Sequence, residues 1–397
     1  MLIELRRPAA EAEVQRSGVA LFRLGFRPFF LAAAAFAAFV VPLWLFVWSG
    51  HATLPAQLLP SAWHAHEMVF GFVVAVIAGF LLTAVRNWTS RPTPTGAALA
   101  SLVALWALGR VALFLEGPIP HVVAALVDLA FLPALTIALA RPIVQSRNWK
   151  NAVFLPLLLL LFTTNALFHF GSPVWAVRAP KIAIDVVLLI VVVIGGRVIP
   201  SFTASALRID VRKHPALDAV ALASLGAVAL LGAVADGSRI YAVVSIAAGF
   251  FHALRLIGWR GWRAWRSPIL WVLHVGYAWI AIGLVLRGVS GFFPTWIPSA
   301  ATHALTVGAI GILILGMMSR VSLGHTGRLL VVTPLVTVAF GFLVLAAIVR
   351  AMGPLLFPEG YFAELVVAGT LWSAAFALFV FVYVPILGAP RVDGKPG

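Results

Sequence analysis

The sequence has no cysteine among its 397 residues. That absence excludes disulfide bonds, thiolate metal sites, iron–sulfur clusters and covalent haem attachment through a C-x-x-C-H motif. Any metal must therefore be held by His, Met or carboxylate side chains. Charge is also scarce: 10% of the residues are charged, against roughly 25% in soluble domains. With 62% hydrophobic residues and a mean hydropathy of +1.05, the composition predicts a polytopic membrane protein.

Acidic residues are especially few, with 13 Asp and Glu against 28 Lys and Arg, which gives a net charge of +15. In a soluble protein this imbalance would suggest a nucleic-acid partner. In a multi-span protein, basic residues instead mark the cytoplasmic loops. We therefore expect the lipid bilayer as the surroundings and no nucleic acid as a partner.

Twelve apolar stretches are long enough to cross a bilayer. They are residues 28–48, 64–85, 97–114, 121–140, 151–170, 181–200, 217–234, 239–257, 269–287, 300–319, 329–350 and 362–386. We predict an all-α polytopic membrane protein with one transmembrane domain over 1–397, a cytoplasmic N-terminal segment at 1–27 and a short cytoplasmic tail at 388–397. No apolar segment with a small-residue cleavage site precedes residue 28, so we expect no cleaved signal peptide.

Basic residues alternate between successive connections of these spans. The basic connections carry Arg86 and Arg91; Arg141, Arg147 and Lys150; Arg208, Arg212 and Lys213; Arg260, Arg263 and Arg266; Arg320 and Arg328. The other connections are nearly bare, with Arg178 and Lys181 as the main exceptions. The positive-inside rule then predicts that both termini are cytoplasmic and that spans 2, 6 and 10 begin on the periplasmic side.

Spans 2 and 10 share a spaced pattern. The series His66-x4-Gly71-x7-Gly79-x9-Thr89 aligns without a gap with His303-x4-Gly308-x7-Gly316-x9-Thr326. The end of span 6, from Arg197 to Thr203, overlays Arg320 to Thr326. Because these spans are four apart, we interpret the chain as three sequential four-helix units with the same membrane orientation. Chance matching among Ala-rich and Gly-rich helices is the alternative.

The stretch SAWHAHEMVFGF, residues 61–72, places His64, His66 and Glu67 at the start of span 2. Ionisable groups inside a span are costly, so they usually face a cavity or a ligand. Neutral imidazole is a common ligand of haem iron and copper. Two residues turn about 200° around a helix, so both histidines cannot address one site unless the helix begins after His64. One can ligate while the other faces a second site or a carboxylate.

His66 and His303 sit at equivalent depth in their units, as a bis-His haem or two neighbouring sites would require. Gly71 and Gly308 follow these histidines by five positions. Small residues there serve either close helix packing or a flat macrocycle lying beside the helix. The sequence leaves both interpretations open.

Further candidates lie on other spans. His169 ends span 5 and His274 lies within span 9, and each is a candidate ligand or part of a proton path. Asp185 lies near the periplasmic start of span 6. Asp128, within span 4, is equally explained by a helix–helix hydrogen bond. Glu67 is a candidate proton donor, or a partner that fixes a histidine tautomer.

Five stretches together resemble the NnrS family: FRLGFRPFF (22–30), WHAHEMVFGFVVAVIAGFLLTAVRNWT (63–89), GGRVIPSFT (195–203), LHVGYAW (273–279) and THALTVGAIGILILGMMSRVSLGHTGR (302–328). The resemblance extends over nearly the whole chain. It implies a bacterial inner-membrane protein that contains haem and copper and belongs to the nitric oxide response. It leaves open whether the protein is an enzyme.

A weaker similarity is to the central subunit of haem–copper oxidases and nitric oxide reductases. It rests on twelve spans in three four-helix arcs, with His near the outer ends of spans 2 and 10. In those proteins spans 6 and 7 supply ligands for a second metal. Here span 6 offers Asp185 but no His, and span 7 has no His. Copper or non-haem iron would need another set, such as His64 or His169 with Asp185.

Together these observations predict a haem, expected to be of the b type, held by His66 and His303, with nitric oxide reduced to N2O near the periplasmic face. Glu67, Asp185 and His169 are the expected catalytic groups. The expected metal ligands are His64, His66, His169, His274 and His303. Electrons would come from a quinol or cytochrome, since the chain has no soluble haem domain. The alternatives are a non-catalytic haem or copper protein that senses nitric oxide, scavenges it or delivers metal, and a proton-coupled transporter.

Overall fold

A computed structural model of the chain describes residues 20–53, 58–212, 214–293, 297–395 and 397. The structure is 82% helical, and its described part contains no β-strand and twelve helices long and apolar enough to cross a membrane. The all-α polytopic fold predicted from the sequence is therefore confirmed. Of the N-terminal segment expected at 1–27, residues 1–19 lie outside the described residues.

The first six spans are α2 (Phe26–Trp48); α3 (Pro60–His66) with η1 (Glu67–Val73) and α4 (Val74–Thr89); α5 (Gly96–Phe114); α6 (His121–Leu129) with α7 (Phe131–Gln145); η2 (Trp149–Asn151) with α8 (Phe154–Phe170); and α9 (Pro173–Leu207). The last six are α10 (Pro215–Val234); α11 (Arg239–Gly258), followed by η3 (Gly261–Ala264); α12 (Pro268–Ser290); α13 (Ile297–His303) with η4 (Ala304–Gly311) and α14 (Ile312–His325); α15 (Pro334–Leu356); and η5 (Pro358–Gly360) with α16 (Tyr361–Gly388). All twelve predicted spans are present.

Local sequence signals explain where several spans begin. Proline stands at the first position of α3, α9, α10, α12 and α15, where its missing N–H leaves no helical hydrogen bond unmade. The side chains of Ser238 and Thr333 cap α11 and α15 by accepting hydrogen bonds from backbone N–H groups. Span 6 is longer than predicted, at 35 residues. The predicted span, residues 181–200, began after Arg178 and ended before Ser201 and Thr203, whereas the helix continues through these polar residues.

Spans 2, 6 and 10 form the centre of the bundle. The helix α9 packs on α3 and η1 of span 2 and on η4 of span 10. In spans 2 and 10, 83% and 72% of the most apolar stretch is buried inside the protein, against 17% in span 7. The last helix of each four-helix unit packs on the first of the next, α7 on α8, α11 on α12 and α16 on α2. The three units therefore form arcs around the central spans.

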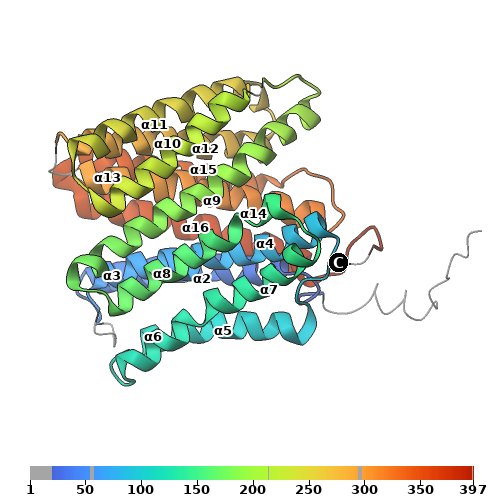
Figure 1. The fold of residues 1–397 in the computed structure, drawn as a ribbon, viewed down its shortest axis with the longest axis horizontal. Helices are drawn as coiled ribbons and strands as arrows, with labels where there is room; N and C mark the ends of the chain where they lie inside the picture. The colour runs from blue at the N-terminus through green and yellow to red at the C-terminus, as the bar shows by residue number, and fades with distance from the viewer. Residues whose placement is uncertain (1–19, 54–57, 213, 294–296, 396) are drawn as a thin grey trace, which may run out of the picture.

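Figure 1 shows the helices lying alongside one another, with α3, α6 and α13 gathered at the left end of the view. We call this the histidine end, because His64, His66, His169 and His303 lie at the ends of spans found there. The chain terminus at Gly397 lies at the opposite end (Figure 1). There, buried Arg27 donates hydrogen bonds to the carbonyls of Leu387 and Ala389, at 2.7 Å each, and so satisfies the end of α16.

The repeat between spans 2 and 10 extends to the backbone. A π-helical segment begins directly after His66 and another directly after His303. The matched threonines, Thr89 and Thr326, each donate a hydrogen bond to the carbonyl four residues earlier. The helix α9 of span 6 is α-helical throughout, so units 1 and 3 resemble each other more closely than either resembles unit 2.

The glycines of the repeat pack against neighbouring rings. A Cβ added at Gly71 would lie 2.7 Å from the Phe36 ring, and one added at Gly308 would lie 2.6 Å from the Trp279 ring. The space beside each glycine is therefore filled by an aromatic side chain of the preceding span. The structure gives these two glycines the helix-packing role, rather than the role of making room for a macrocycle.

This packing predicts the effect of two alanine substitutions. Gly308→Ala should lower the melting temperature in detergent, because overpacking a buried contact costs about 1–3 kcal/mol. Gly341→Ala is the matched control, since no atom lies within 4 Å of its added Cβ and alanine is the better helix former. Tryptophan fluorescence during heating measures both. Equal melting temperatures in the two variants would contradict this account of Gly308.

Candidate functional site

Two polar sites lie back to back on span 2 at the histidine end. His64 lines a cavity that also borders spans 1, 6, 10, 11 and 12. His66 instead contacts Asp128 of span 4 and Asn165 of span 5. The helix turns about 200° between the two residues, which explains why they face opposite sides.

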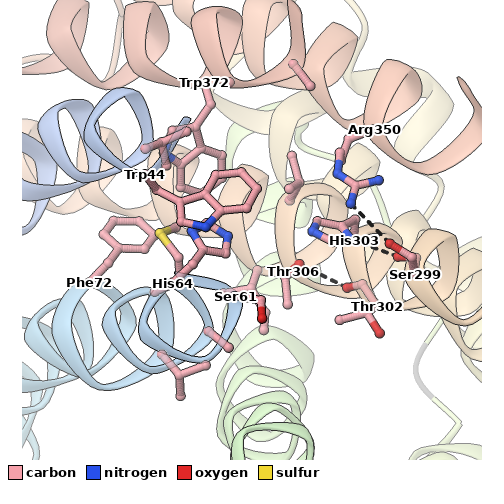
Figure 2. Close-up of a pocket in the computed structure, with 18 of the residues that line it drawn as sticks. Trp44, Ser61, His64, Phe72, Ser299, Thr302, His303, Thr306, Arg350 and Trp372 are labelled. Atoms are coloured by element: carbon pink, nitrogen blue, oxygen red, sulfur yellow. Dashed lines mark hydrogen bonds between the residues drawn. The ribbon is translucent and has the colours of Figure 1, made fainter. Parts of the chain in front are cut away.

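The cavity has a volume of about 320 Å³, within the ~300–1,000 Å³ range of small-molecule sites. Most of its wall is apolar, and aromatic rings form much of it. The aromatic lining residues include Trp44, Trp48, Phe72, Tyr361 and Trp372 (Figure 2). The polar lining side chains include His64, Ser299, Thr302, His303 and Arg350 (Figure 2). Such a site suits a largely apolar ligand that carries a few polar groups.

Both cavity histidines offer nitrogen atoms to a ligand. Nδ1 of His303 lies 2.8 Å from the Ser299 carbonyl oxygen. Because a carbonyl only accepts, Nδ1 carries the proton, and in the neutral ring Nε2 is left with a free lone pair. The His64 ring stacks on Trp44 with centroids 4.2 Å apart, and its buried Nδ1 has no hydrogen-bond partner among the described residues. Fixing one nitrogen by a carbonyl is how proteins orient metal-binding histidines.

Arg350 places an unpaired donor at the margin of the cavity. Its Nη2 donates to Ser299 Oγ at 3.1 Å and to the Tyr361 hydroxyl at 3.2 Å. Its buried Nη1 has no partner among the described residues. A guanidinium group recognises carboxylate and phosphate oxygens through paired donors, so the cavity can bind a ligand with an anionic group.

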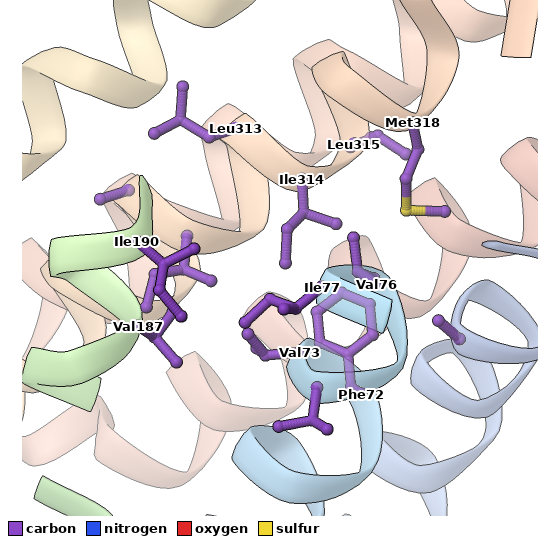
Figure 3. Packing of buried hydrophobic residues seen from close by; sticks show 14 of the residues in the cluster. Phe72, Val73, Val76, Ile77, Val187, Ile190, Leu313, Ile314, Leu315 and Met318 are labelled. Atoms are coloured by element: carbon purple, nitrogen blue, oxygen red, sulfur yellow. The ribbon is translucent and has the colours of Figure 1, made fainter. Parts of the chain in front are cut away.

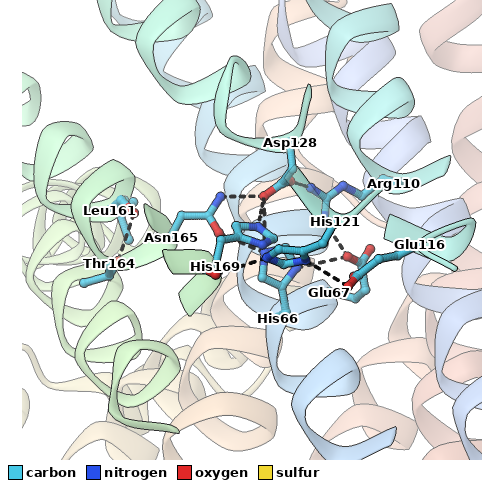
Figure 4. A network of polar contacts seen from close by, with 10 residues as sticks. All are labelled: His66, Glu67, Arg110, Glu116, His121, Asp128, Leu161, Thr164, Asn165 and His169. Atoms are coloured by element: carbon cyan, nitrogen blue, oxygen red, sulfur yellow. Dashed lines mark hydrogen bonds and ion pairs between the residues drawn. The ribbon is translucent and has the colours of Figure 1, made fainter. Parts of the chain in front are cut away.

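The second site is a buried network of side chains from spans 2 to 5. Its members are His66, Glu67, Arg110, Asp128, Asn165 and His169 (Figure 4). Asp128 is the hub: its Oδ2 accepts from Asn165 Nδ2 at 2.7 Å and lies 3.1 Å from His169 Nε2. Arg110 bridges the two carboxylates, with Nη1 2.7 Å from Glu67 and Nη2 paired with Asp128.

The network has one more negative than positive charge when its histidines are neutral. Two carboxylates face a single guanidinium, and an uncompensated buried charge is strongly unfavourable. A further cation, either a proton on an imidazole or a metal ion, would balance it. His66, Asp128 and His169 each offer one ligand atom, and these three atoms lie within 4.8 Å of one another. His169 Nδ1 is buried without a partner among the described residues. This set could hold a metal.

Two further polar residues connect the network with the rim of the histidine end. His121 Nε2 lies 3.1 Å from the His169 carbonyl oxygen, and its Nδ1 lies 2.9 Å from Glu116. The His121 side chain is 35% exposed, whereas that of His169 is fully buried. A partly exposed histidine, paired with the buried carboxylate of Glu116, therefore stands beside the buried network.

The sequence model of the family described as NnrS protein matches residues 20–391. The chain belongs to the NnrS family. Both sites lie within the matched residues. Family membership makes this a multi-pass membrane protein of the nitric oxide response, in a family known for binding metals. A search of curated proteins finds no match.

In this NnrS protein, two of the expected catalytic groups, Glu67 and His169, lie close together with His66. His66, Glu67 and His169 all belong to the buried network. His66 and His303, which were expected to share a haem, face different sites. His303 lines the cavity, and His66 lies on the opposite face of span 2. The partner of His303 across the cavity is His64 (Figure 2). Equal depth in two units does not determine the direction of a side chain around its helix.

Asp185 and His274 lie away from both sites. Asp185 pairs with Arg287 of α12, while its neighbours Ile184 and Val187 line the cavity from the other side of α9. A second metal had been expected between Asp185 and either His64 or His169. Asp185 instead lies beside neither histidine. His274 lies in span 9 toward the opposite end, with Nε2 2.8 Å from Thr203 Oγ1.

Sequence reasoning missed the arginines of both sites. Arg110 lies in LWALGRVALF and Arg350 in LAAIVRAMG, both inside apolar runs. An arginine within a span is rare and usually functional, so both arginines could have been predicted as site residues from the sequence. Asn165 and the hub role of Asp128 carried no comparable signal, because a single polar residue in a span is often only a helix–helix contact.

The charge count predicts how substitutions in the network affect stability. Arg110→Met should be strongly destabilising, by about 3–5 kcal/mol, because it leaves two buried carboxylates without their cation. Asp128→Asn should cost less, since Arg110 keeps Glu67 and the net charge disappears. Adding Asp128→Asn to Arg110→Met should partly restore stability. Thermal unfolding in detergent ranks the three variants.

Arg141→Met, at an exposed position, controls for the loss of an arginine and should leave the melting temperature unchanged. If the double variant were no more stable than Arg110→Met alone, charge balance would not govern this network.

Proposed function

We propose that this NnrS protein binds haem in the cavity between His64 and His303 and removes nitric oxide there by reducing it to N2O. The observation that carries the proposal is the pair of imidazoles lining one apolar cavity, one of them with Nδ1 fixed and Nε2 free. Imidazole is a common haem ligand, and an apolar cavity of this kind suits a macrocycle.

The residues present fit a haem in three respects. His64 and His303 would each offer an imidazole nitrogen to the iron, and the buried Nδ1 of His64 has no other partner among the described residues. Arg350 has an unpaired Nη1 to pair with a haem carboxylate. Trp44 and Trp372 provide broad apolar walls. Bound haem would supply an iron coordination position for nitric oxide and a carrier for single electrons.

The protein's own side chains would supply the surroundings for the reaction. Two NO, two electrons and two protons give N2O and water. The apolar walls exclude bulk water and admit an uncharged gas. The network of His66, Glu67, Asp128 and His169 holds ionisable groups on the other face of span 2, and these could store the protons. Electrons would come from a quinol or cytochrome partner.

We further propose that His66, Asp128 and His169 hold a second metal, copper or non-haem iron. The proposal rests on their converging ligand atoms, the unpaired His169 Nδ1 and the charge deficit of the network. A bound cation would balance the buried carboxylates. Two neutral imidazoles and a carboxylate are a ligand set that such metals accept.

The proposed setting is the bacterial inner membrane, with both termini cytoplasmic. The basic connections, from Arg86 and Arg91 to Arg320 and Arg328, lie at the end of the bundle opposite to His64. The positive-inside rule makes that end cytoplasmic and the histidine end periplasmic.

One observation favours a second candidate function, binding of nitric oxide without turnover. Among the described residues the cavity is lined by two histidines only, and the His66 set lies behind span 2. No second metal set therefore borders the cavity. Such a haem protein would sense or scavenge nitric oxide, or pass on metal.

The haem assignment predicts which variants lose cofactor. His64→Ala and His303→Ala should each lower haem per protein severalfold or change the optical spectrum, because each removes an imidazole that would hold the haem. His66→Ala should keep the haem. His169→Ala should lower the copper or iron content beyond haem while leaving the haem bands intact. Optical spectra and metal analysis of purified protein measure these contents.

His51→Ala is the matched control, since His51 is exposed at the same end. Full haem with unchanged spectra in both cavity variants, each eluting as an intact monodisperse protein, would refute the assignment.

Turnover is tested with the reduced protein and excess nitric oxide in a sealed vessel. If the protein is a reductase, N2O in the headspace should exceed the haem present many times, given a quinol donor. Nitric oxide bound once per haem, without N2O, would select the binding function instead.

A further inference from the structure

A second, smaller cavity lies between the same three central spans. Its volume is about 80 Å³. Span 2 contributes Ile77 and Phe80, span 6 contributes Ile190 and Ile194, and span 10 contributes Ile314 and Met317, among others. Phe30 of span 1 also lines it. The small cavity lies farther from the histidine end than the large cavity.

This small cavity offers nothing for a polar molecule to bind. Among the described residues, every one that lines it is apolar or glycine, and none contributes a side-chain nitrogen or oxygen. A buried water needs two to four polar partners, whereas dry apolar cavities take up xenon or small hydrocarbons. The fitting occupant is therefore a small, uncharged, apolar molecule.

The two cavities are neighbours along all three spans. The large one is lined by Val73, Val187 and Ile310, and the small one begins at Val76, Ile190 and Leu313. Each step is three residues, close to one helical turn or about 5 Å. Figure 3 shows Val73, Val76, Val187 and Ile190 in one cluster of aliphatic side chains between these helices.

A partition made only of aliphatic side chains can open by small motions. No hydrogen bond has to break, because no polar group belongs to it. Five residues that line the small cavity are only partly buried: Phe80, Val191, Ile194, Val198 and Met317. Its far side therefore lies near the protein surface, within the length of the membrane spans. A gas dissolved in lipid therefore has a short apolar route inward.

We propose that the small cavity binds a diatomic gas and relays it between the bilayer and the large cavity. The identity of the gas as nitric oxide rests on the proposed function. The ability of the small cavity to hold an apolar gas is independent of the proposed function, because it follows from the lining of the cavity alone.

The binding step is tested with xenon on the full-length protein, by 129Xe NMR or by xenon-pressurised crystals. We expect xenon between Ile77, Ile190 and Ile314. Val76→Phe should abolish that signal, because the ring fills the space. Val338→Phe, the same change at a half-exposed position outside both cavities, should keep it. Val76→Leu adds less volume and keeps the test valid if the phenylalanine variant does not fold.

The relay step is tested by flash photolysis of nitric oxide from the haem-loaded protein. Val76→Phe should slow rebinding from solution about tenfold, the effect of ~1.4 kcal/mol of added barrier. Haem content and spectrum should not change. Absence of xenon from the cavity, or an unchanged rate where xenon is displaced, would overturn the relay. A protein without haem would instead refute the proposed function, and the xenon result would still decide the cavity.

Discussion

The structure depends on one constraint: a bilayer does not solvate buried charge, so every charged group inside the bundle needs a partner within the protein. Three arginines at the histidine end illustrate it. Arg110 pairs with two carboxylates and Arg287 with Asp185. Arg350 has only hydroxyl partners and an unpaired Nη1 among the described residues. Of these three, Arg350 is the one that forms no ion pair among the described residues, and it borders the large cavity, which is why we propose a ligand with an acidic group there.

The π-helical segments connect the repeat with the cavity. Both follow a histidine of the repeat, and both line the cavity, η1 through Met68 and Phe72 and η4 through Thr306 and Ile310. A π segment shifts the phase of the residues that follow it, and such segments occur often at functional sites. The helix α9, which has none, contributes only aliphatic side chains to the cavity. The two units that share the distortion thus share one site.

The fold could be predicted from the sequence because a membrane allows few kinds of structure, and each sufficiently long apolar stretch indicates one span. Helix geometry alone predicted that His64 and His66 face different sides. The site could not be predicted to the same degree. Whether His66 joins His303 or Asp128 depends on rotation of each helix and on neighbours up to a hundred residues away. The alignment of span 2 with span 10 paired His66 with His303, and each of them directly precedes a π-helical segment. It could not give their direction, which the Arg110 and Asp128 contacts determine.

Span 2 separates two kinds of path. On one side, between spans 2, 6 and 10, the two cavities form a succession of largely apolar spaces that suits an uncharged gas. On the other, between spans 2 and 5, partly exposed His121 stands beside a buried network of ionisable groups that suits protons. Residues 61–73 contribute to both. A reaction that consumes a gas together with protons needs these routes to converge without letting water follow the gas. One helix with His64 on its largely apolar face and His66 on its polar face suits that requirement.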